Sequence, residues 1–221
     1  MQTHRIDYRN LRLRSMNTPQ YRHLNLLWGW VGFFLLYFLT ENRIPAENCH
    51  LVHIPLDDRI PFCPWFVIFY VGWYALIILS LGYFLLYSVE SFKALQTYII
   101  ITQALAMVVY ILYPTRQDLR PEIFVRDNLF TDILRLLYRI DTPTGVCPSL
   151  HAAISVAIAS VWLREKQANP WLKAGVALFC FGVCLSVVFV KQHSVVDVFA
   201  AIPLCLIAEW LVFVRKRRGK G

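Results

Sequence analysis

The sequence predicts an all-α membrane protein, a six-transmembrane helical bundle with an amphipathic helix in the long extracytoplasmic loop between spans 3 and 4. Of the 221 residues, 57% are hydrophobic and the mean hydropathy is +0.49, whereas a soluble domain is about 45–50% apolar. The apolar residues form long unbroken runs rather than short alternating ones, which favours helices over a β-barrel. The basic residues concentrate in alternate loops, which favours an even number of spans.

Six apolar segments have roughly the length that crosses a hydrocarbon core of about 30 Å at about 1.5 Å per residue. We expect the spans at 24–40, 65–89, 96–113, 149–163, 172–190 and 194–214. The fourth is short and has the weakest hydropathy signal. The first span follows an arginine-rich segment without a small-residue cleavage site, so we expect residues 1–23 to be retained.

The distribution of charge predicts the orientation of the chain. The net charge is +8, and 14 of the 22 Lys and Arg residues lie in the two terminal segments and the second and fourth loops. Basic residues favour the cytoplasmic side, so we expect a multi-pass cell-membrane protein with cytoplasmic segments at 1–23 and 215–221. These basic tails suit anionic lipid headgroups rather than nucleic acid.

The two long outer loops, 41–64 and 114–148, carry different signals. Within 129–140 the apolar residues follow a helical period, while one aspartate and two arginines recur on the opposite face. We expect this segment to be the amphipathic helix, lying on the membrane or covering the bundle, with its arginines at the interface.

The 41–64 loop is expected to be irregular, because three prolines between 54 and 64 favour turns. The charged run from Asp57 to Arg59 is interpreted as a solvated edge of a lid rather than a functional site. Cys49 and Cys63 share this loop, and a disulfide between them is one option that the sequence leaves open.

A polar stretch separates the fifth and sixth spans and contains Lys191, His193 and Asp197. Ionisable side chains at membrane depth are costly and usually face a cavity or a functional site. His193 and Asp197 are four residues apart, so on a helix they share one face and the carboxylate can orient the imidazole. A functionless polar break between two spans is the alternative at this point.

A second polar cluster begins the fourth span, where Pro148 and Ser149 precede His151. Proline and serine suit the start of a helix. The free N–H groups and the dipole make that end an anion site, with His151 beside it. Spans four and six both run from outside to inside, so His151 and His193 are expected at similar depth on the same face.

Two arginines, Arg116 and Arg120, follow the third span on the same side. A guanidinium binds phosphate oxygens in a bidentate way. Two histidines, a carboxylate, a helix N-terminus and several cations together suit phosphate-ester chemistry. No carboxylate cluster suggests a two-metal site, so we expect no metal and no cofactor.

These residues resemble the motifs of the type-2 phosphatidic acid phosphatase superfamily of six-span membrane enzymes. The family motifs are Lys-x6-Arg-Pro, Pro-Ser-Gly-His and Ser-Arg-x5-His-x3-Asp. Arg120 and the following proline match the end of the first, and 148–151 match the second at three of four places. Ser186, His193 and Asp197 match the third in spacing. The resemblance covers roughly residues 95 to 210.

The chain departs from the family pattern at three positions. Tyr113 stands in place of the first-motif lysine, Leu150 in place of the glycine, and Val187 in place of the third-motif arginine. Arg116 and Lys191 are candidates to supply the missing charges. This altered set is similar to the branch that includes inositolphosphorylceramide synthase-like and sphingomyelin synthase-like proteins.

The resemblance implies a membrane lipid phosphatase with its active site at the extracytoplasmic face. We expect His193 to attack phosphorus and form a phosphohistidine, Asp197 to orient it, and His151 to protonate the leaving alcohol. The groups expected to bind the phosphate oxygens are Arg120, Lys191, Arg116, Ser149 and the backbone of Leu150.

The expected substrate is a phosphomonoester or diphosphate of a membrane lipid, and the sequence does not say which one. A phospholipid headgroup transferase, in which a lipid alcohol replaces water, is the first alternative. A non-catalytic membrane scaffold is the second. The oligomeric state is left open.

Overall fold

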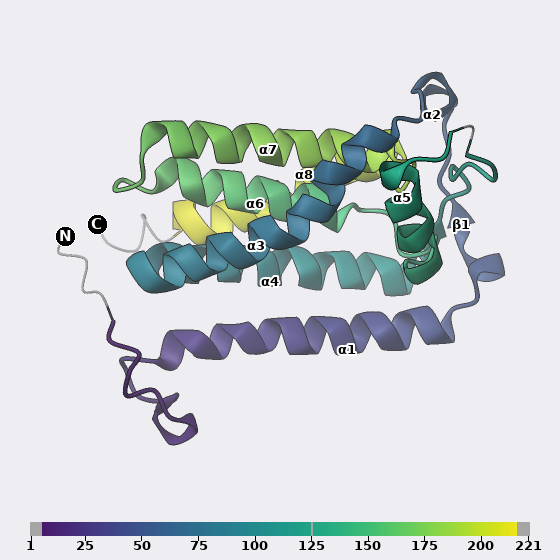
Figure 1. Cartoon of the computed structure of the whole chain (residues 1–221). Helices are drawn as coiled ribbons and strands as arrows, with labels where there is room; N and C mark the ends of the chain where they lie inside the picture. Colours follow the sequence, from purple (N-terminus) through teal and green to yellow (C-terminus); the bar gives the residue numbers. More distant parts are fainter. Residues whose placement is uncertain (1–5, 125, 216–221) are drawn as a thin grey trace.

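The computed structural model describes residues 6–124 and 126–215, and it is mostly helical. The long helices run up and down a bundle (Figure 1). They are α1 (Trp28–Arg43), α3 (Val67–Tyr87), α4 (Val89–Leu112), α6 (Leu150–Arg164), α7 (Pro170–Phe189) and α8 (Val195–Glu209). A π-helical segment, Trp210–Val214, continues α8. The shorter elements are the 3-10 helices Leu13–Ser15, Arg22–Leu27, Ala46–Asn48 and Pro64–Phe66, the strands β1 (His50–Leu51) and β2 (Thr115–Arg116), and the helices α2 (Pro55–Arg59) and α5 (Leu129–Ile140).

Five helical segments among the described residues are long and apolar enough to cross a membrane, which is compatible with a multi-pass membrane protein. They are Arg22–Arg43, Pro64–Tyr87, Val89–Leu112, Pro170–Phe189 and Val195–Val214. α6 is shorter, with 15 residues, and it reaches only about 22 Å at about 1.5 Å per residue. Parts of the expected basic tails, residues 1–5 and 216–221, lie outside the described residues.

Several helical segments begin before the positions that hydropathy predicts, and α4 differs most. The expected third span starts at 96, but α4 begins at Val89 and includes the polar residues Glu90 and Lys93. Lys93 Nζ donates to Glu90 at 2.9 Å, one helical turn away. Hydropathy misses this turn because its side chains are polar, although its backbone is helical. The first helical segment likewise starts at Arg22 as a 3-10 helix that leads into α1.

α6 lies at the centre of the bundle, against α4, α7 and α8. Its alanines, including Ala152, Ala153 and Ala157, are buried and allow the neighbouring helices to approach closely. α1 is peripheral and has no buried residue. It packs on α4, where a Cβ at Gly29 would lie 2.5 Å from Ile100. Glycine at this position therefore permits the contact between the two helices.

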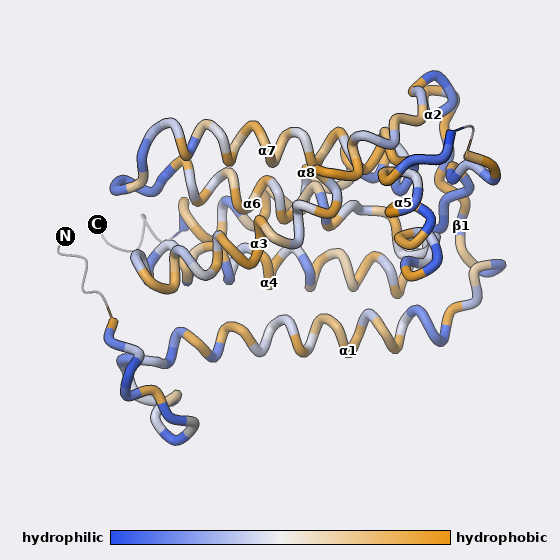
Figure 2. The backbone as a smooth tube through the Cα atoms, viewed as in Figure 1, coloured by the Kyte–Doolittle hydropathy of each residue, from blue (hydrophilic) through white to orange (hydrophobic). Residues whose placement is uncertain are grey.

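The segments that connect α1 to α3 and α4 to α6 gather at one end of the bundle, called the α5 end, which holds α2, β1 and α5 (Figure 1). β1 pairs in parallel with β2, joining the segment after α1 to the segment after α4. Figure 2 shows hydrophobic residues along the long helices and hydrophilic stretches at both ends of the bundle. Cys49 and Cys63, for which the sequence left a disulfide open, both carry free thiols.

Candidate functional site

The turn between α7 and α8 holds the first half of the candidate site. Ser194 caps α8 and its hydroxyl accepts from Val196 N, while Asp197 Oδ2 accepts from Ser194 N at 3.0 Å. The same carboxylate oxygen accepts from His193 Nδ1 at 3.2 Å, and Asp197 is fully buried. A proton on Nδ1 leaves the lone pair of the ring on Nε2, which is the tautomer that a nucleophilic or basic imidazole requires.

The first turn of α6 supplies the second histidine. The rings of His151 and His193 are 5.6 Å apart between centroids. The His151 ring lies between aromatic neighbours, with Trp73 at 4.2 Å and Tyr70 at 4.5 Å between ring centroids. Its buried Nε2 has no hydrogen-bond partner among the described residues. This nitrogen is therefore available to a bound molecule.

A backbone contact brings the two histidine segments together. Ser149 is buried and caps α6, where its hydroxyl accepts from Ala152 N at 3.4 Å. Its own N–H donates to the carbonyl oxygen of Asp197 at 2.9 Å. The starts of α6 and α8 are thus joined directly, which accounts for the similar depth of His151 and His193. Ser149 itself serves as a cap, and Leu150 beside it lines the cavity described next.

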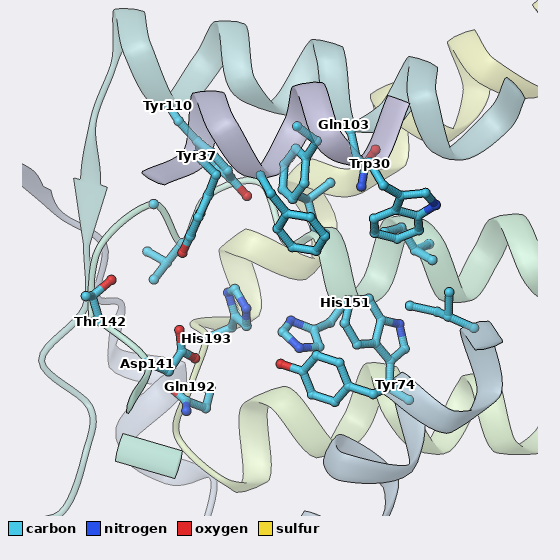
Figure 3. Close-up of a pocket in the computed structure, with 18 of the residues that line it drawn as sticks. Trp30, Tyr37, Tyr74, Gln103, Tyr110, Asp141, Thr142, His151, Gln192 and His193 are labelled. Atoms are coloured by element: carbon cyan, nitrogen blue, oxygen red, sulfur yellow. The ribbon is translucent and has the colours of Figure 1, made fainter. Parts of the chain in front are cut away.

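Both histidines line one end of a cavity of about 590 Å³, within the range of about 300–1,000 Å³ that is usual for small-molecule sites. The cavity lies between α1, α3, α4 and α6, and most of its walls are apolar. Apolar lining residues include Trp30, Phe33, Ile77, Leu81 and Ile154. Polar lining residues near the histidines are Asp141, Thr142 and Gln192, and Figure 3 shows them on the same side as His193.

Arg120 reaches this end of the cavity through Gln192. Its Nε donates to Gln192 Oε1 at 3.1 Å, and Nη2 donates to the same oxygen. The remaining guanidinium bonds go to the backbone carbonyls of Tyr138, Asp141 and Thr142 at 2.9–3.2 Å. The expected phosphate ligand is therefore engaged with protein groups, and it orients the amide next to His193.

Gln192 is a candidate functional residue that the sequence reasoning missed. Arginine only donates, so its contact assigns the amide oxygen of Gln192 and directs the amide nitrogen elsewhere. That Nε2 is buried and has no hydrogen-bond partner among the described residues. Gln192 lines the cavity beside His193, so two N–H groups are available to an oxygen there. Its position next to His193 in a polar break was the only signal in the sequence.

Lys191 is not brought to the cavity. It has a positive φ of 55°, and its ammonium donates to the carbonyls of Asp57 and Ile60, both at 2.6 Å. Burial lowers the pKa of Lys191, against the opposing effect of the charges on Asp57 and Asp58. The expectation that Lys191 binds phosphate is corrected here, because the turn directs its side chain to the α2 loop.

Asp57 is likewise not a solvated lid edge. It is fully buried, and its carboxylate accepts from Ser194 Oγ at 2.7 Å and from Val195 N at 2.9 Å. A carboxylate at this end of α8 stabilises the helix through its free N–H groups and its dipole. Asp57 and Lys191 together fasten the outer loop to the turn that carries His193, whereas Asp58 and Arg59 are exposed.

Arg116 is separate from the histidine pair. Its backbone pairs with β1, and it makes an isolated bridge with Thr144. Its Nε is buried without a hydrogen-bond partner among the described residues, and its side chain does not line the cavity. The structure thus brings together His151, His193, Asp197 and Leu150, links Arg120 to them through one residue, and leaves Arg116 apart.

Asp141 adds a carboxyl group that the sequence reasoning did not select. It lines the cavity, and its Oδ2 accepts from Tyr70 Oη at 3.2 Å. Burial raises the pKa of Asp141, while the charges of Arg120 and His193 act in the opposite direction. A carboxyl group in its neutral form tolerates a nearby phosphate better than a carboxylate does, because like charges repel.

The described residues contain no cluster of three or more His, Cys, Asp or Glu side chains that could hold a metal ion. The groups that the structure places at the polar end of the cavity are the two imidazoles, the amide of Gln192 and the carboxyl of Asp141. Comparisons with protein-family models, curated proteins and solved structures find no match to this chain.

Proposed function

We propose that this protein is a membrane lipid phosphatase that hydrolyses a phosphomonoester or diphosphate of a lipid through a phosphohistidine. One observation carries the proposal. The rings of His151 and His193 lie at the polar end of an apolar cavity with their centroids 5.6 Å apart, and the buried Asp197 holds the His193 ring. An apolar cavity with reactive groups at one end suits a molecule with a hydrocarbon chain and a phosphate head.

In the first step, His193 Nε2 attacks phosphorus and the bond between phosphorus and the lipid oxygen breaks. Asp197 accepts the hydrogen bond from Nδ1 and stabilises the positive charge that develops on the ring. His151 donates a proton to the departing oxygen, which leaves as the lipid alcohol from a phosphomonoester or as the lipid monophosphate from a diphosphate. The Nε2 atom of His151, without a partner in the protein, is suited to this transfer.

In the second step, a water molecule attacks the phosphohistidine and His151 accepts its proton. The bond between nitrogen and phosphorus breaks, inorganic phosphate leaves, and both imidazoles return to their starting states. Gln192 Nε2 and the free N–H groups at the start of α6 are the donors proposed for the phosphate oxygens. Arg120 contributes by holding Gln192 and by its positive charge.

The proposal includes six spans, with α6 as the short fourth one, both termini in the cytoplasm and the α5 end outside. The asymmetry of Lys and Arg supports this orientation. α6 and α8 begin at the same end, joined by the bond between Ser149 and Asp197. In this orientation α5 is an amphipathic helix at the outer membrane surface. We also propose membership of the type-2 phosphatidic acid phosphatase superfamily, on the three partial motifs.

The test is phosphate release from a panel of phosphorylated lipids by the purified protein in detergent micelles. We expect His193→Ala to abolish release and His151→Ala to lower it about 10²–10⁴-fold, as for loss of a general acid. Thr102→Val on α4 is a matched control, because its hydroxyl bonds only carbonyls of its own helix. Rapid acid quench with labelled substrate should trap a phosphohistidine in the wild-type protein.

The same assay separates the alternatives. Headgroup exchange to a lipid alcohol without phosphate release would replace hydrolysis by transfer. Near-normal release by a folded His193→Ala variant would refute the nucleophile. Absence of both reactions across the panel, in protein with an intact thermal transition, would favour a scaffold.

A further inference from the structure

The turn that carries His193 is held along its length by the outer loop that contains α2, at the α5 end (Figure 1). At the start of the turn, Cys63 N donates to the carbonyl oxygen of Phe189 at 2.9 Å. In the middle, the Lys191 ammonium donates to the carbonyl oxygen of Asp57 at 2.6 Å. The position of His193 therefore depends on a segment that lies far earlier in the chain.

The side chain of Asp57 holds the end of the turn. Its Oδ2 accepts from Ser194 Oγ at 2.7 Å, and its Oδ1 accepts from Val195 N at 2.9 Å. Oδ2 also accepts from Ile54 N at 2.9 Å, which fixes the carboxylate to its own loop. Because Asp57 is fully buried, water does not compete for these bonds. One carboxylate thus anchors two consecutive residues at the start of α8.

Ser194 connects Asp57 to the pair formed by His193 and Asp197. Its hydroxyl donates to Asp57, while its backbone N–H donates to Asp197 Oδ2 at 3.0 Å. The same Oδ2 atom accepts from His193 Nδ1 at 3.2 Å. A continuous chain of hydrogen bonds therefore runs from the outer loop through Ser194 and Asp197 to the imidazole.

The buried charge of Asp57 is better suited to fixing an orientation than to stabilising the fold. Taking a carboxylate out of water is costly, and replacing a buried ion pair by apolar residues of similar volume is often neutral for stability. Burial lowers the pKa of Lys191 while the charge of Asp57 opposes this change, so the two groups compensate each other only in part. Hydrogen bonds to a carboxylate are short and directional. What Asp57 adds beyond an apolar residue is therefore the direction of the groups bound to it.

His193 lies between two anchored stretches of the turn. Arg120 holds Gln192, the residue immediately before it, through a bond of 3.1 Å from Nε to Oε1. Asp57 holds the two residues that follow it. Loss of the Asp57 carboxylate would leave the turn anchored on one side only, and the imidazole would be free to change its direction.

We propose that Asp57 is a positioning residue of the phosphatase, through which the outer loop holds the His193 ring in the direction required for attack on phosphorus. Asp57 lies outside the three family motifs, so the resemblance assigns it no role. A reacting group displaced by about 1 Å can lose about 10²-fold in rate. The inference rests on the proposed phosphatase function and adds a residue to its machinery.

The kinetic test compares Asp57→Asn with Asp58→Asn in the phosphate-release assay. Asparagine keeps the shape of Asp57 but has a single acceptor oxygen, so either Ser194 Oγ or Val195 N loses its partner. We expect kcat to fall about 10–100-fold, with KM nearly unchanged, because Asp57 is not one of the residues that line the cavity. Asp58→Asn should keep the wild-type kcat, since Asp58 is exposed and bonds His53.

Variants of Ser194 separate positioning from a general loss of stability, with every assay run well below the lowest Tm of the set. Ser194→Thr keeps the hydroxyl that donates to Asp57 and should retain most of the wild-type kcat, whereas Ser194→Ala should lower it. Because Asp57→Asn and Ser194→Ala break the same bond, the double variant should lose less than the product of the two single losses. Losses that multiply in the double variant would overturn the inference.

An NMR measurement keeps this inference distinct from the proposed function. In protein with isotope-labelled histidine, the Nδ1 proton of His193 should give a resonance that is missing in His193→Ala. We expect Asp57→Asn to shift or broaden this resonance and Asp58→Asn to leave it unchanged. An unchanged resonance in Asp57→Asn, or a changed one with wild-type kcat, would overturn the inference. A changed resonance in a protein that hydrolyses none of the lipids would support the positioning of the His193 ring and refute the phosphatase alone.

Discussion

Replacing Gln192 by glutamate tests whether its amide nitrogen binds the phosphate. In the structure Gln192 Oε1 accepts two guanidinium bonds from Arg120, one of them at 3.1 Å, and Nε2 has no partner among the described residues. Glutamate keeps an oxygen for Arg120 and strengthens that contact by its charge. It also replaces the free N–H donor by an oxygen that repels a phosphate.

The magnitude follows from the groups that change. Loss of one donor that stabilises charge in the transition state costs about 10²–10³ in kcat. Repulsion between the new carboxylate and the phosphate adds to this, so Gln192→Glu should lose at least about 10³-fold. Its Tm should not fall, because the bonds to Arg120 remain. Gln192→Leu should lose about 10²–10³-fold and also unfold at lower temperature, since Arg120 loses its acceptor.

The assay combines phosphate release with thermal unfolding of each purified variant. If Gln192 only anchors Arg120, Gln192→Glu would remain active, since the anchor is preserved. Activity of this variant within about threefold of wild type, with a normal Tm, corresponds to less than about 1 kcal/mol and would refute the assignment.

Three further outcomes are expected. Lys191→Met should lower Tm by several degrees without raising KM, because the carbonyls of Asp57 and Ile60 lose their donor. A raised KM at unchanged Tm would instead indicate that Lys191 binds the phosphate. Hydrogen bonds to Asp58 and then to Asp118 raise the pKa of His53. The stabilisation of the outer loop by protonated His53 is therefore fully present below about pH 6.5 and is lost as pH rises through the raised pKa. Hydrogen exchange of the loop should increase over that pH range, and His53→Gln should show no such step. Burial raises the pKa of Asp141, so its carboxylate should repel the phosphate increasingly as pH rises through that raised value. Asp141→Asn should lessen the resulting rise of KM with pH, and an unchanged profile would contradict this role.

The three central residues of the candidate site were accessible from the sequence because they depend on local geometry. The spacing of His193 and Asp197 places them within one helical turn, and a serine cap with a following histidine marks a helix start. Alternating helix direction then places His151 at the same end. The structure adds the backbone bond between Ser149 and Asp197 that joins the two segments.

The neighbouring residues Lys191 and Gln192 show where sequence reasoning fails. A cation next to His193 is the more plausible phosphate ligand by charge alone. The positive φ of Lys191 directs its ammonium to the carbonyls of Asp57 and Ile60, and Gln192 lines the cavity instead. A single backbone dihedral in a turn decides between them, and spacing carries no information about it.

By itself, the sequence determined the helical class, the order of the apolar helices and the segments that carry the two histidines. These properties follow from hydropathy, helix period and caps, which act within a segment. Only the tertiary structure decided that Gln103, Asp141 and Gln192 face the cavity, and that Asp57 is buried. Those outcomes depend on how each helix is rotated about its axis and on contacts between segments far apart in the chain, which no local pattern encodes.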